Sequence, residues 1–470
     1  MSVRKKDLYL ISFLDERSVI LAESIRASDA NEGKKSLIIF TNVPNDKFAG
    51  NSLYKKAKRL RCIMLRDDIC SVSLRFHHPA ALTRFILINP DETVNVNDSL
   101  LLAEKYRDKI KAEIYVFASS AESECLLDAV DKGGGFGAIP PLKIRRVNVI
   151  RNQIYKYLFE NSIFENAVTV MNEKIISVLI VGLGSYGTEV LKAILWCGQI
   201  IGYILKINVV DISPDAEQRF YADCPGIRQR GNQPLNGEDY YELTFYSGVD
   251  VFTESFSEIV KSLDETTQVF VCLGNEQSNI EAALKLRSVF SGMSIDAGRK
   301  PRHTKEDKQS PEITAVIDNI QKAALLRQNR LRNFKDQYYD ISCIGCDSEK
   351  YSYENIFIPT LEKIALEAHL KWGGEESFNN FEYYRRSSMA SAIHKKYRLE
   401  LLPDDAELRA MNEHIRWNAY MRSTEGYSFG LIRDDLARRH ATLIKYSLLA
   451  AAEKNKDSKM NTDARTEELN

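Results

Sequence analysis

The sequence has no excess of charge of either sign, because 64 lysines and arginines offset 65 aspartates and glutamates among its 470 residues. A protein that binds polynucleotides non-specifically presents a basic surface, so this balance disfavours a nucleic acid partner. Long apolar runs are also missing. The two longest uncharged stretches, 175–188 and 193–205, are too short to span a bilayer and both contain glycine. We therefore expect no nucleic acid polymer as partner and no insertion into a membrane.

Signals for export are absent as well. The opening segment MSVRKKDLYLISFLDE has only a short apolar run before its first acidic residues and no small-residue cleavage site. Eight cysteines are scattered along the chain, several of them inside apolar patterns, which is typical of reduced, buried thiols. These features predict a cytoplasmic protein.

The short motifs of several enzyme classes are missing too. The sequence contains no G-x-S-x-G turn, no P-loop lysine motif and no HExxH zinc motif. The single C-x-x-C pair, Cys343 and Cys346, has no second pair at zinc-finger spacing, and His77 and His78 have no cysteine or carboxylate beside them. We therefore expect no metal site and assign no catalytic residue.

The length favours about three domains, because a single core rarely grows this large. In residues 1–170, apolar runs at 8–14, 37–40, 85–88 and 114–117 alternate with helical patterns, which predicts a doubly wound parallel sheet. The first turn, FLDERSV, has no glycine to cradle a diphosphate. This first domain is therefore predicted to be a degenerate Rossmann-like domain.

A second α/β domain is expected over residues 171–332. It opens on IISVLIVGLGSYGTEVLKAIL, and its later strands are predicted at 207–210, 250–252, 269–273 and 313–317. A hydrophilic loop is expected over 297–312.

The rest of the chain has a different character. From 333 to 452 the patterns are mainly helical, with aromatic and charged residues mixed. Residues 453–470 have almost no apolar content and are predicted to be disordered.

The second domain carries a complete G-x-G-x-x-G pattern directly after a strand and at the start of a helix. The first glycine allows a tight turn, the second removes a side chain where a diphosphate approaches, and the third lets helix and strand pack closely. The helix start then offers free N–H groups to an anion. The candidate phosphate-binding residues are Gly182, Gly184, Ser185, Tyr186 and Gly187. The alternative is a glycine turn kept only for packing.

Two further positions complete the predicted cofactor site. Asp211 ends the second strand 24 residues after Gly187, where a carboxylate accepts hydrogen bonds from an adenosine ribose and favours NAD. Lys206 and Arg219 are close enough in sequence to leave a 2′-phosphate, and hence NADP, open. After the fourth strand, CLGN places Gly274 and Asn275 where the far end of a dinucleotide would lie.

The segment IISVLIVGLGSYGTEV resembles the nucleotide-binding domain of the TrkA potassium-uptake family and the related RCK domains that regulate potassium conductance. In the first domain, ILINPDETVNVNDSLLLAEKY and AEIYVFASSAESECLLD are similar to strand, turn and helix segments of the same family. The resemblance implies binding of NAD or a related adenine dinucleotide. It also implies a homodimer or larger assembly, with an effector or channel as a conceivable partner.

Near the carboxyl end, RAMNEHIRWNAYMRSTEGYSFG and RRHATLIKYSLL resemble the ryanodine-receptor (RyR) repeat in its bacterial form. The preceding YYRRSSMASAIHKKYRLELL is similar to the segment before that repeat in bacterial proteins. Gly426-Tyr427 stands where the family commonly has Gly-Trp, and Ser388 stands where an asparagine is expected. The resemblance implies an intracellular ligand sensor, and it links the module to nucleotide signals in antiviral defence.

On a helix, these carboxy-terminal residues would form two neighbouring stripes of charge and aromatic surface. Arginine beside tryptophan could stack a purine or clamp a phosphate, and glutamate and histidine could orient a base. The alternative is an internal Glu413–Arg416 ion pair under a half-buried tryptophan. The candidate ligand-binding residues are Arg385, Glu413, His414, Arg416, Trp417, Tyr420 and Tyr427.

The expected function is that of a nucleotide-binding sensor or regulator whose ligand changes domain packing or assembly. One alternative is an NAD(P)-dependent oxidoreductase in which Glu413 or His414 supplies acid–base chemistry. Another is a cytoplasmic regulator of potassium transport.

Overall fold

A computed structural model describes residues 6–44, 51–74, 81–134, 139–228, 241–298, 311–328 and 339–459. The chain forms two compact units. The first contains the chain up to Asn152 together with 347–366 and 373–386. The second contains 153–346, 367–372 and the chain from Ser387 on. The helical region after the second sheet is thus shared between both units.

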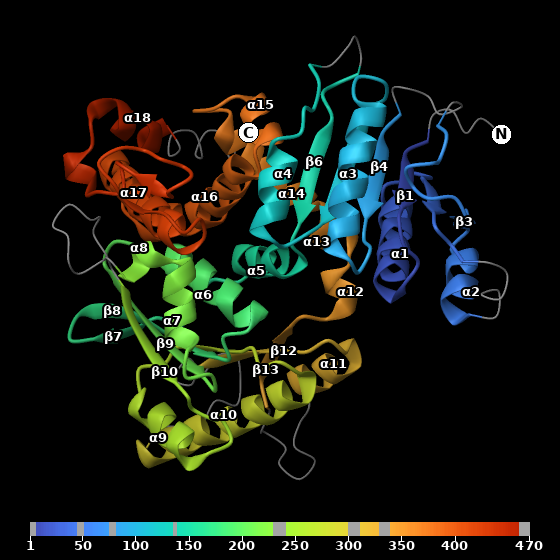
Figure 1. Ribbon diagram of the computed structural model, residues 1–470. Helices are drawn as coiled ribbons and strands as arrows, with labels where there is room; N and C mark the ends of the chain where they lie inside the picture. The colour runs from blue at the N-terminus through green and yellow to red at the C-terminus, as the bar shows by residue number, and fades with distance from the viewer. Residues whose placement is uncertain are drawn as a thin grey trace. The chain divides into compact units, whose positions relative to one another are not determined.

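The first unit contains a six-stranded parallel sheet in the order β3-β2-β1-β4-β5-β6 (Figure 1). Numbered within the sheet, this is the 3-2-1-4-5-6 order of a Rossmann fold. Its strands are β1 (Leu8–Ile11), β2 (Leu37–Phe40), β3 (Ile63–Met64), β4 (Thr83–Leu87), β5 (Ala112–Phe117) and β6 (Lys143–Val147). Its crossover helices are α1 (Glu16–Asn31), α2 (Ser52–Arg59), α3 (Glu92–Tyr106) and α4 (Ala121–Asp128).

The central strands of this sheet are apolar because both of their faces are covered. Leu10 and Ile11 are neighbours on β1 and point to opposite faces, yet neither is exposed to solvent. Phe85 and Ile86 on β4 are equally buried. One apolar cluster contains Leu10 and Phe85, and another contains Ile11 and Ile86, so the sheet separates two cores.

The second unit repeats the same strand order in the sheet β10-β9-β8-β11-β12-β13, with β7 added antiparallel to β8. Its strands are β7 (Val168–Val170), β8 (Glu173–Val181), β9 (Tyr203–Asp211), β10 (Tyr241–Ser247), β11 (Gln268–Val271), β12 (Glu312–Val316) and β13 (Ile341–Ile344). Its helices include α6 (Ser185–Cys197), α7 (Ala216–Asp223), α8 (Pro225–Arg228), α9 (Glu254–Ser262), α10 (Glu276–Asp296) and α11 (Ile320–Gln328). The prediction of an α/β fold with two parallel sheets is confirmed.

The remaining helices are α5 (Val149–Glu160), α12 (Asp347–Lys350), α13 (Tyr353–Phe357), α14 (Pro359–His369), α15 (Glu375–Asn380), α16 (Glu382–Leu401), α17 (Ala406–Ser423) and α18 (Ala451–Lys459). A short two-stranded pairing joins β14 (Ser428–Phe429) to β15 (Arg439–His440). Within the described part of the chain, no helix is long and apolar enough to cross a membrane.

In the second unit, α17 packs along α6 (Figure 1). The ring of Trp196, on α6, meets the ring of Tyr420 edge-on at 6.3 Å between centroids. Polar contacts hold the same end of α6. Asn412 Nδ2 donates to the carbonyl oxygen of Gln199 (2.8 Å), and Ser423 Oγ donates to that of Lys192 (3.1 Å). The helix that follows the glycine loop is therefore fixed to the carboxy-terminal helical region.

One predicted strand of the second sheet is wrong. Residues 250–252 form a turn, and the third strand is β10 at 241–247. This strand lies at the sheet edge, where alternating polar residues obscure its pattern. The sheet also extends to β13, inside the region expected to be helical from 333. Position 333 itself lies outside the described residues, and the helical region begins at α12.

Helix α18 occupies 451–459, where the prediction placed the start of a disordered tail. Its Asp457 carboxylate lies 3.4 Å from Nδ1 of His414, a tertiary contact that composition alone does not reveal. Residues 460–470 lie outside the described residues, as do His77, His78 and most of the expected loop at 297–312.

Candidate functional site

The glycine loop lies at the topological switch point of the second sheet, where β8 and β11 are neighbours but their crossovers leave in opposite directions. Gly182 has φ +90°, and a Cβ there would lie 2.7 Å from the carbonyl oxygen of Cys272. A Cβ at Gly187 would lie only 1.8 Å from the carbonyl oxygen of Gly182. The first and third glycines are therefore required by the local backbone.

The second glycine has a different environment. Gly184 is exposed, and no described atom lies within 4 Å of the place a Cβ would occupy. It is the N-cap of α6 and, as a glycine, has no side chain to cap that helix start. Ser185 beside it is also exposed. The start of α6 is thus exposed at Gly184 and Ser185, and an exposed helix N-terminus is able to bind an anion.

A second open position faces the same edge of the sheet. Gly274 is exposed after β11, and no described atom lies within 4 Å of its Cβ position. Its neighbour Asn275 caps α10 by accepting a hydrogen bond from the N–H of Ser278 (2.8 Å). CLGN therefore provides open backbone beside the glycine loop, while its asparagine side chain has a structural role.

Asp211 connects the end of β9 to the loop. Its Oδ2 accepts a hydrogen bond from the N–H of Leu183 (2.6 Å), and its Oδ1 accepts one from the N–H of Ser213 (2.7 Å). Each carboxylate oxygen can accept a further bond, so a ribose hydroxyl could still be bound here. The structure brings Asp211 next to the loop that contains Gly182 and Gly184.

Tyr186 has a packing role. Its hydroxyl donates to Oε1 of Gln153 on α5 (2.9 Å), and the side chain is half-buried. The side chain of Tyr186 therefore contributes to packing.

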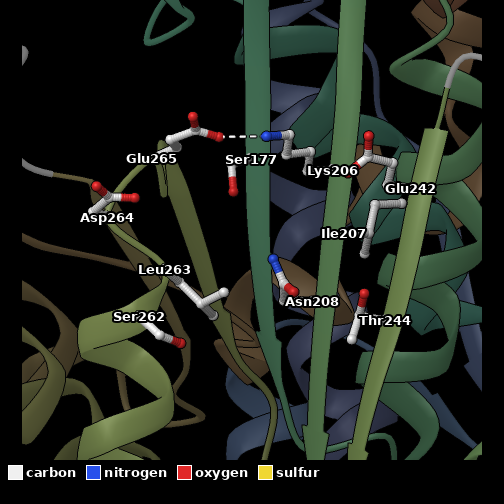
Figure 2. A pocket seen from close by; sticks show the side chains of 10 residues that line it. All are labelled: Ser177, Lys206, Ile207, Asn208, Glu242, Thr244, Ser262, Leu263, Asp264 and Glu265. Atoms are coloured by element: carbon white, nitrogen blue, oxygen red, sulfur yellow. Dashed lines mark hydrogen bonds and ion pairs between the residues drawn. The ribbon is translucent and has the colours of Figure 1, made fainter. Parts of the chain in front are cut away.

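The two cations considered for a 2′-phosphate lie at different ends of β9. Arg219 is exposed and donates to Oγ of Ser213 (2.6 Å), beside Asp211. Lys206 lies five residues earlier on the strand, about 16 Å from Asp211 at roughly 3.3 Å per residue. Lys206 lines a separate pocket of about 210 Å³ and forms an ion pair there with Glu265 (2.5 Å). Figure 2 shows the side chains that line this pocket. Of the two, only Arg219 lies beside the ribose position.

The corresponding place in the first sheet is filled by the protein itself. Asp15 is the N-cap of α1, and its Oδ1 accepts the N–H of Ser18 (2.9 Å). Arg17 donates to Asp15 Oδ2 (2.6 Å) and to the carbonyl oxygen of Ile88 (3.0 Å), and so links the ends of β1 and β4. A carboxylate thus occupies the position where an anion would bind.

Two of the RyR-like candidates form a fully enclosed charge network. Glu413 accepts hydrogen bonds from Arg416 (2.8 and 3.1 Å), Arg398 and Ser391 (2.8 Å). Glu413, Arg398 and Arg416 have no measurable solvent exposure. Burial opposes ionisation, but Arg416 and Arg398 lower the pKa of Glu413 to about 2. This is the internal ion pair that the packing alternative expects, with a second arginine that sequence reasoning missed.

The remaining RyR-like candidates in this unit flank that network. His414 stacks on Trp417 at 5.8 Å, and Trp417 meets His440 edge-on at 5.2 Å. Tyr427 lies beside His440, and its hydroxyl donates to Asp435 (3.1 Å). Burial lowers the pKa of His440 to about 4. Trp417 is half-buried, so an aromatic cluster reaches the surface of the unit.

The buried Tyr420 donates its hydroxyl to Glu425 (2.7 Å) and belongs to the packing of α17 on α6.

Arg385 lies in the first unit, whereas the other RyR-like candidates lie in the second unit. It is buried and bound to Glu382 (2.5 and 3.0 Å). Its neighbour Arg386 makes a two-bond contact with the carboxylate of Glu124 (2.6 Å for each bond). Both guanidinium groups are thus engaged within the first unit.

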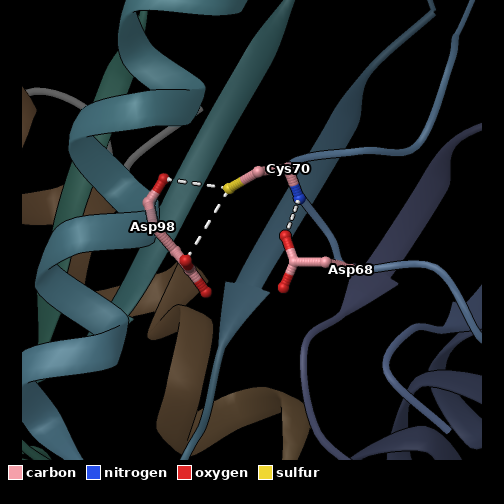
Figure 3. Close-up of side chains that lie close together, drawn as sticks. All are labelled: Asp68, Cys70 and Asp98. Atoms are coloured by element: carbon pink, nitrogen blue, oxygen red, sulfur yellow. Dashed lines mark hydrogen bonds between the residues drawn. The ribbon is translucent and has the colours of Figure 1, made fainter.

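Two thiol-containing groups were also considered. Cys343 and Cys346 are buried, the first on β13 and the second just after it, and the Cys343 thiol donates weakly to the carbonyl oxygen of Ala323 (3.8 Å). In the first unit, Asp68, Cys70 and Asp98 bring possible ligand atoms within 4.8 Å of one another (Figure 3).

The electrostatics of the cluster of Asp68, Cys70 and Asp98 keep its thiol protonated. Burial, helped by Asp98, raises the pKa of the Cys70 thiol to about 12. Burial and Asp68 raise the pKa of Asp98 to about 6. At neutral pH the thiol therefore serves as a hydrogen-bond donor to Asp98 (3.7 Å). Sequence reasoning had no signal for this cluster, because Asp98 is 28 residues away from Cys70.

No family model matches the chain, and no curated protein matches its sequence.

Proposed function

We propose that the chain is a regulatory protein that binds a dinucleotide, NAD or a related adenine dinucleotide, at the carboxyl edge of the second sheet. The observation that carries this proposal is the uncapped, open start of α6 at Gly184. A helix start with free N–H groups, a glycine without steric contacts and a nearby strand-end carboxylate together match the needs of a diphosphate with an attached ribose.

Each part of the site would have a defined task. The N–H groups of the first turn of α6 would bind the diphosphate, and the gap at Gly184 would let it approach the backbone. Asp211 would accept the ribose hydroxyls through its free lone pairs. Gly274, beside the glycine loop, would face the far half of the ligand. An aspartate at the ribose position favours NAD over NADP.

Regulation fits the surroundings of the site better than catalysis. The oxidoreductase alternative needs Glu413 or His414 as acid or base. Glu413 is enclosed, doubly paired with arginine and held ionised with a pKa of about 2, which makes it unsuited to proton transfer near neutral pH. His414 Nε2 donates to the carbonyl oxygen of Ile444 (2.8 Å), and its Nδ1 lies 3.4 Å from the carboxylate of Asp457. Both groups are engaged in structural contacts.

The effect of ligand binding would be transmitted through α6 to the helices packed against it. A ligand at the start of this helix acts on an element whose other end is bound to α17 by Trp196 and Asn412. A ligand that favours one arrangement shifts its population by the difference in affinity between the states. In line with the RCK-like resemblance, the change would be read as assembly of a homodimer or larger form, and in line with the RyR-like one, the signal would be an adenine nucleotide in cytoplasmic antiviral defence.

The decisive experiment is a calorimetric titration of the full chain with NAD. The variant Gly184→Val places a branched side chain where a Cβ has no atom of another described residue within 4 Å and φ is −73°, so the fold should persist. We expect NAD affinity to fall by at least about tenfold, because the side chain would occupy the diphosphate position.

The matched control is Gly374→Val. Gly374 is also an exposed helix N-cap for which the described chain supplies no side-chain cap and no atom within 4 Å of a Cβ. The Gly374→Val variant should leave NAD binding unchanged. Equal NAD affinity in the wild type and in folded Gly184→Val would reject the proposal. Steady conversion of bound NAD to NADH with a supplied alcohol or hydroxy acid would instead favour the oxidoreductase.

A further inference from the structure

A second cavity, in the first unit, has a different chemistry from the glycine loop. It measures about 260 Å³ and lies on one face of β4, β5 and β6, where α13, α14 and α15 contribute its other wall. Arg84, Glu113 and Lys143 are direct partners across the three strands, so their side chains share that face. Tyr115 and Arg145 are paired two residues further along β5 and β6, and their side chains therefore lie on the same face.

The lining of this cavity carries more positive than negative charge. Arg84 pairs with Glu113 (2.9 Å), and Arg145 pairs with Glu362 (2.8 Å), so four of the charged groups neutralise one another. Burial opposes ionisation of Glu113, but Arg84 holds its pKa below the ordinary value, so the pair is ionised. The lining also contains Lys143 and Lys363, so it has two more cations than anions.

Lys143 is the cation available to a ligand. Its side chain is half-buried, and within the described part of the chain it makes no hydrogen bond and no ion pair. Arg145, its near neighbour, is held in place by Asn379 as well as by Glu362 (2.6 and 2.8 Å). One uncommitted ammonium group among charges that are already paired is suited to a single anionic group.

The rest of the lining is aromatic. The rings of Tyr115 and Phe357 meet edge-on at 4.6 Å, and those of Tyr353 and Phe357 lie at 4.8 Å. Phe378 closes the cavity beside Asn379. Burial raises the pKa of Tyr115 well above its ordinary value, so this wall stays uncharged at neutral pH. Packed rings of this kind favour a planar, apolar body in the ligand.

The volume limits the size of the ligand. A cavity of roughly 150 Å³ is enough for benzene, and sites for drug-sized molecules begin at about 300 Å³. A cavity of about 260 Å³ therefore accommodates one ring with one small charged substituent, and is too small for a dinucleotide. We propose that this cavity of the first unit is a binding site for a small aromatic carboxylate, with its ring against Tyr115 and Phe357 and its carboxylate on Lys143.

This site is independent of the glycine loop, and its test uses benzoate as the probe. Saturation-transfer NMR on the full chain should show saturable binding of benzoate, and much weaker binding of benzamide, which has no charge, and of acetate, which has no ring. Excess NAD should not displace benzoate. The variant Lys143→Gln should weaken benzoate binding by about tenfold or more, because it removes one charge-assisted contact.

Two further variants make the result specific. Lys143→Arg keeps the charge and should retain most of the binding. Lys55→Gln, at an exposed lysine on α2 without an ion pair among the described residues, should have no effect. The proposal is overturned if benzoate shows no saturable binding, if benzamide binds equally well, or if folded Lys143→Gln binds benzoate like the wild type. These outcomes leave the NAD titration of Gly184→Val unaffected, so the two proposals fail separately.

Discussion

The carboxylate of Asp211 accepts a hydrogen bond from the backbone N–H of Leu183 at 2.6 Å, and this bond ties the end of β9 to the glycine loop. Asp211, which would bind the ribose, therefore also stabilises the conformation of the glycine loop. Substitution at this position should affect both the ligand and the loop.

We expect Asp211→Ala to weaken NAD binding by at least about tenfold and to lower the free energy of unfolding by about 1–3 kcal/mol, because the N–H groups of Leu183 and Ser213 lose their acceptor. Calorimetry and urea denaturation measure the two effects. Asp215→Ala is the control, since Asp215 is an exposed N-cap whose side chain makes no capping hydrogen bond within the described chain. Wild-type behaviour of Asp211→Ala in both measurements would contradict the assignment.

Gly187→Ala should be destabilising even without ligand. Its Cβ would meet the carbonyl oxygen of Gly182 at 1.8 Å, and this oxygen belongs to backbone that cannot turn away as a flexible side chain could. Overpacking of this kind costs about 1–3 kcal/mol and sometimes more. Thermal denaturation followed by circular dichroism should show the loss, and Gly274→Ala, which meets no described atom, should not. Equal stability of the two variants would show that the turn can relax.

Glu413→Gln should destabilise the second unit by about 3–5 kcal/mol at neutral pH, because it leaves Arg398 and Arg416 buried without a counter-charge. The pKa of Glu413 in the folded protein, about 2, lies below its ordinary value of 4.5. Its contribution is therefore complete above about pH 4.5 and is lost as the pH falls toward 2. Denaturation of wild type and variant across this range should show their difference shrinking, and Glu407→Gln, on the exposed first turn of α17, should match the wild type throughout.

His440 should remain neutral at physiological pH. Burial, and secondarily Arg433, lowers its pKa to about 4, within the aromatic cluster that includes Trp417. An NMR titration of its ring proton should show no inflection between pH 5 and 8 and one near pH 4. Trp417→Ala would expose the ring, and the inflection should then move toward the ordinary value of 6.5. A wild-type inflection near 6.5 would contradict the enclosed cluster.

Each chain should bind one dinucleotide although it contains two Rossmann-ordered sheets. In the first sheet, Asp15 and Arg17 occupy the helix start and the switch point, whereas in the second the start of α6 at Gly184 is open. Calorimetry should give a stoichiometry of one NAD per chain. Two sites per chain, or one site that persists in folded Gly184→Val, would show that the first sheet binds as well.

The fold was largely predictable where strands are apolar on both faces, and was missed where they are not. The segment 37–40 coincides with β2, and β5 and β12 lie close to their predicted positions. β6 has the sequence KIRRV, and its two arginines hide a strand from any hydrophobicity pattern. They are buried because Arg145 pairs with Glu362 and Arg146 with Glu124. Such compensation between distant residues cannot be read from the strand itself.

The candidate sites divide in the same way. The glycine loop and Asp211 were predictable because strand, turn and helix are consecutive in the sequence and the strand order brings their ends together. Glu413, His414, Arg416, Trp417 and Tyr420 lie on one helix, as predicted, whereas Arg385 lies on α16 and Tyr427 lies beyond α17. Arg398, on α16, completes the network around Glu413. The cavity at Lys143 combines three strands with residues more than 200 positions away, so only the folded chain reveals it.

The packing of α6 has a mechanical consequence. A thirteen-residue helix is a stiff rod about 20 Å long, with the open backbone of Gly184 at one tip and the indole of Trp196 near the other. A displacement of the first end of α6 should also be transmitted to its contact with α17. The helix has no proline, and no glycine beyond its first turn, at which it could bend. Binding of the proposed ligand at the start of α6 would therefore be coupled to the packing of α17 on this helix.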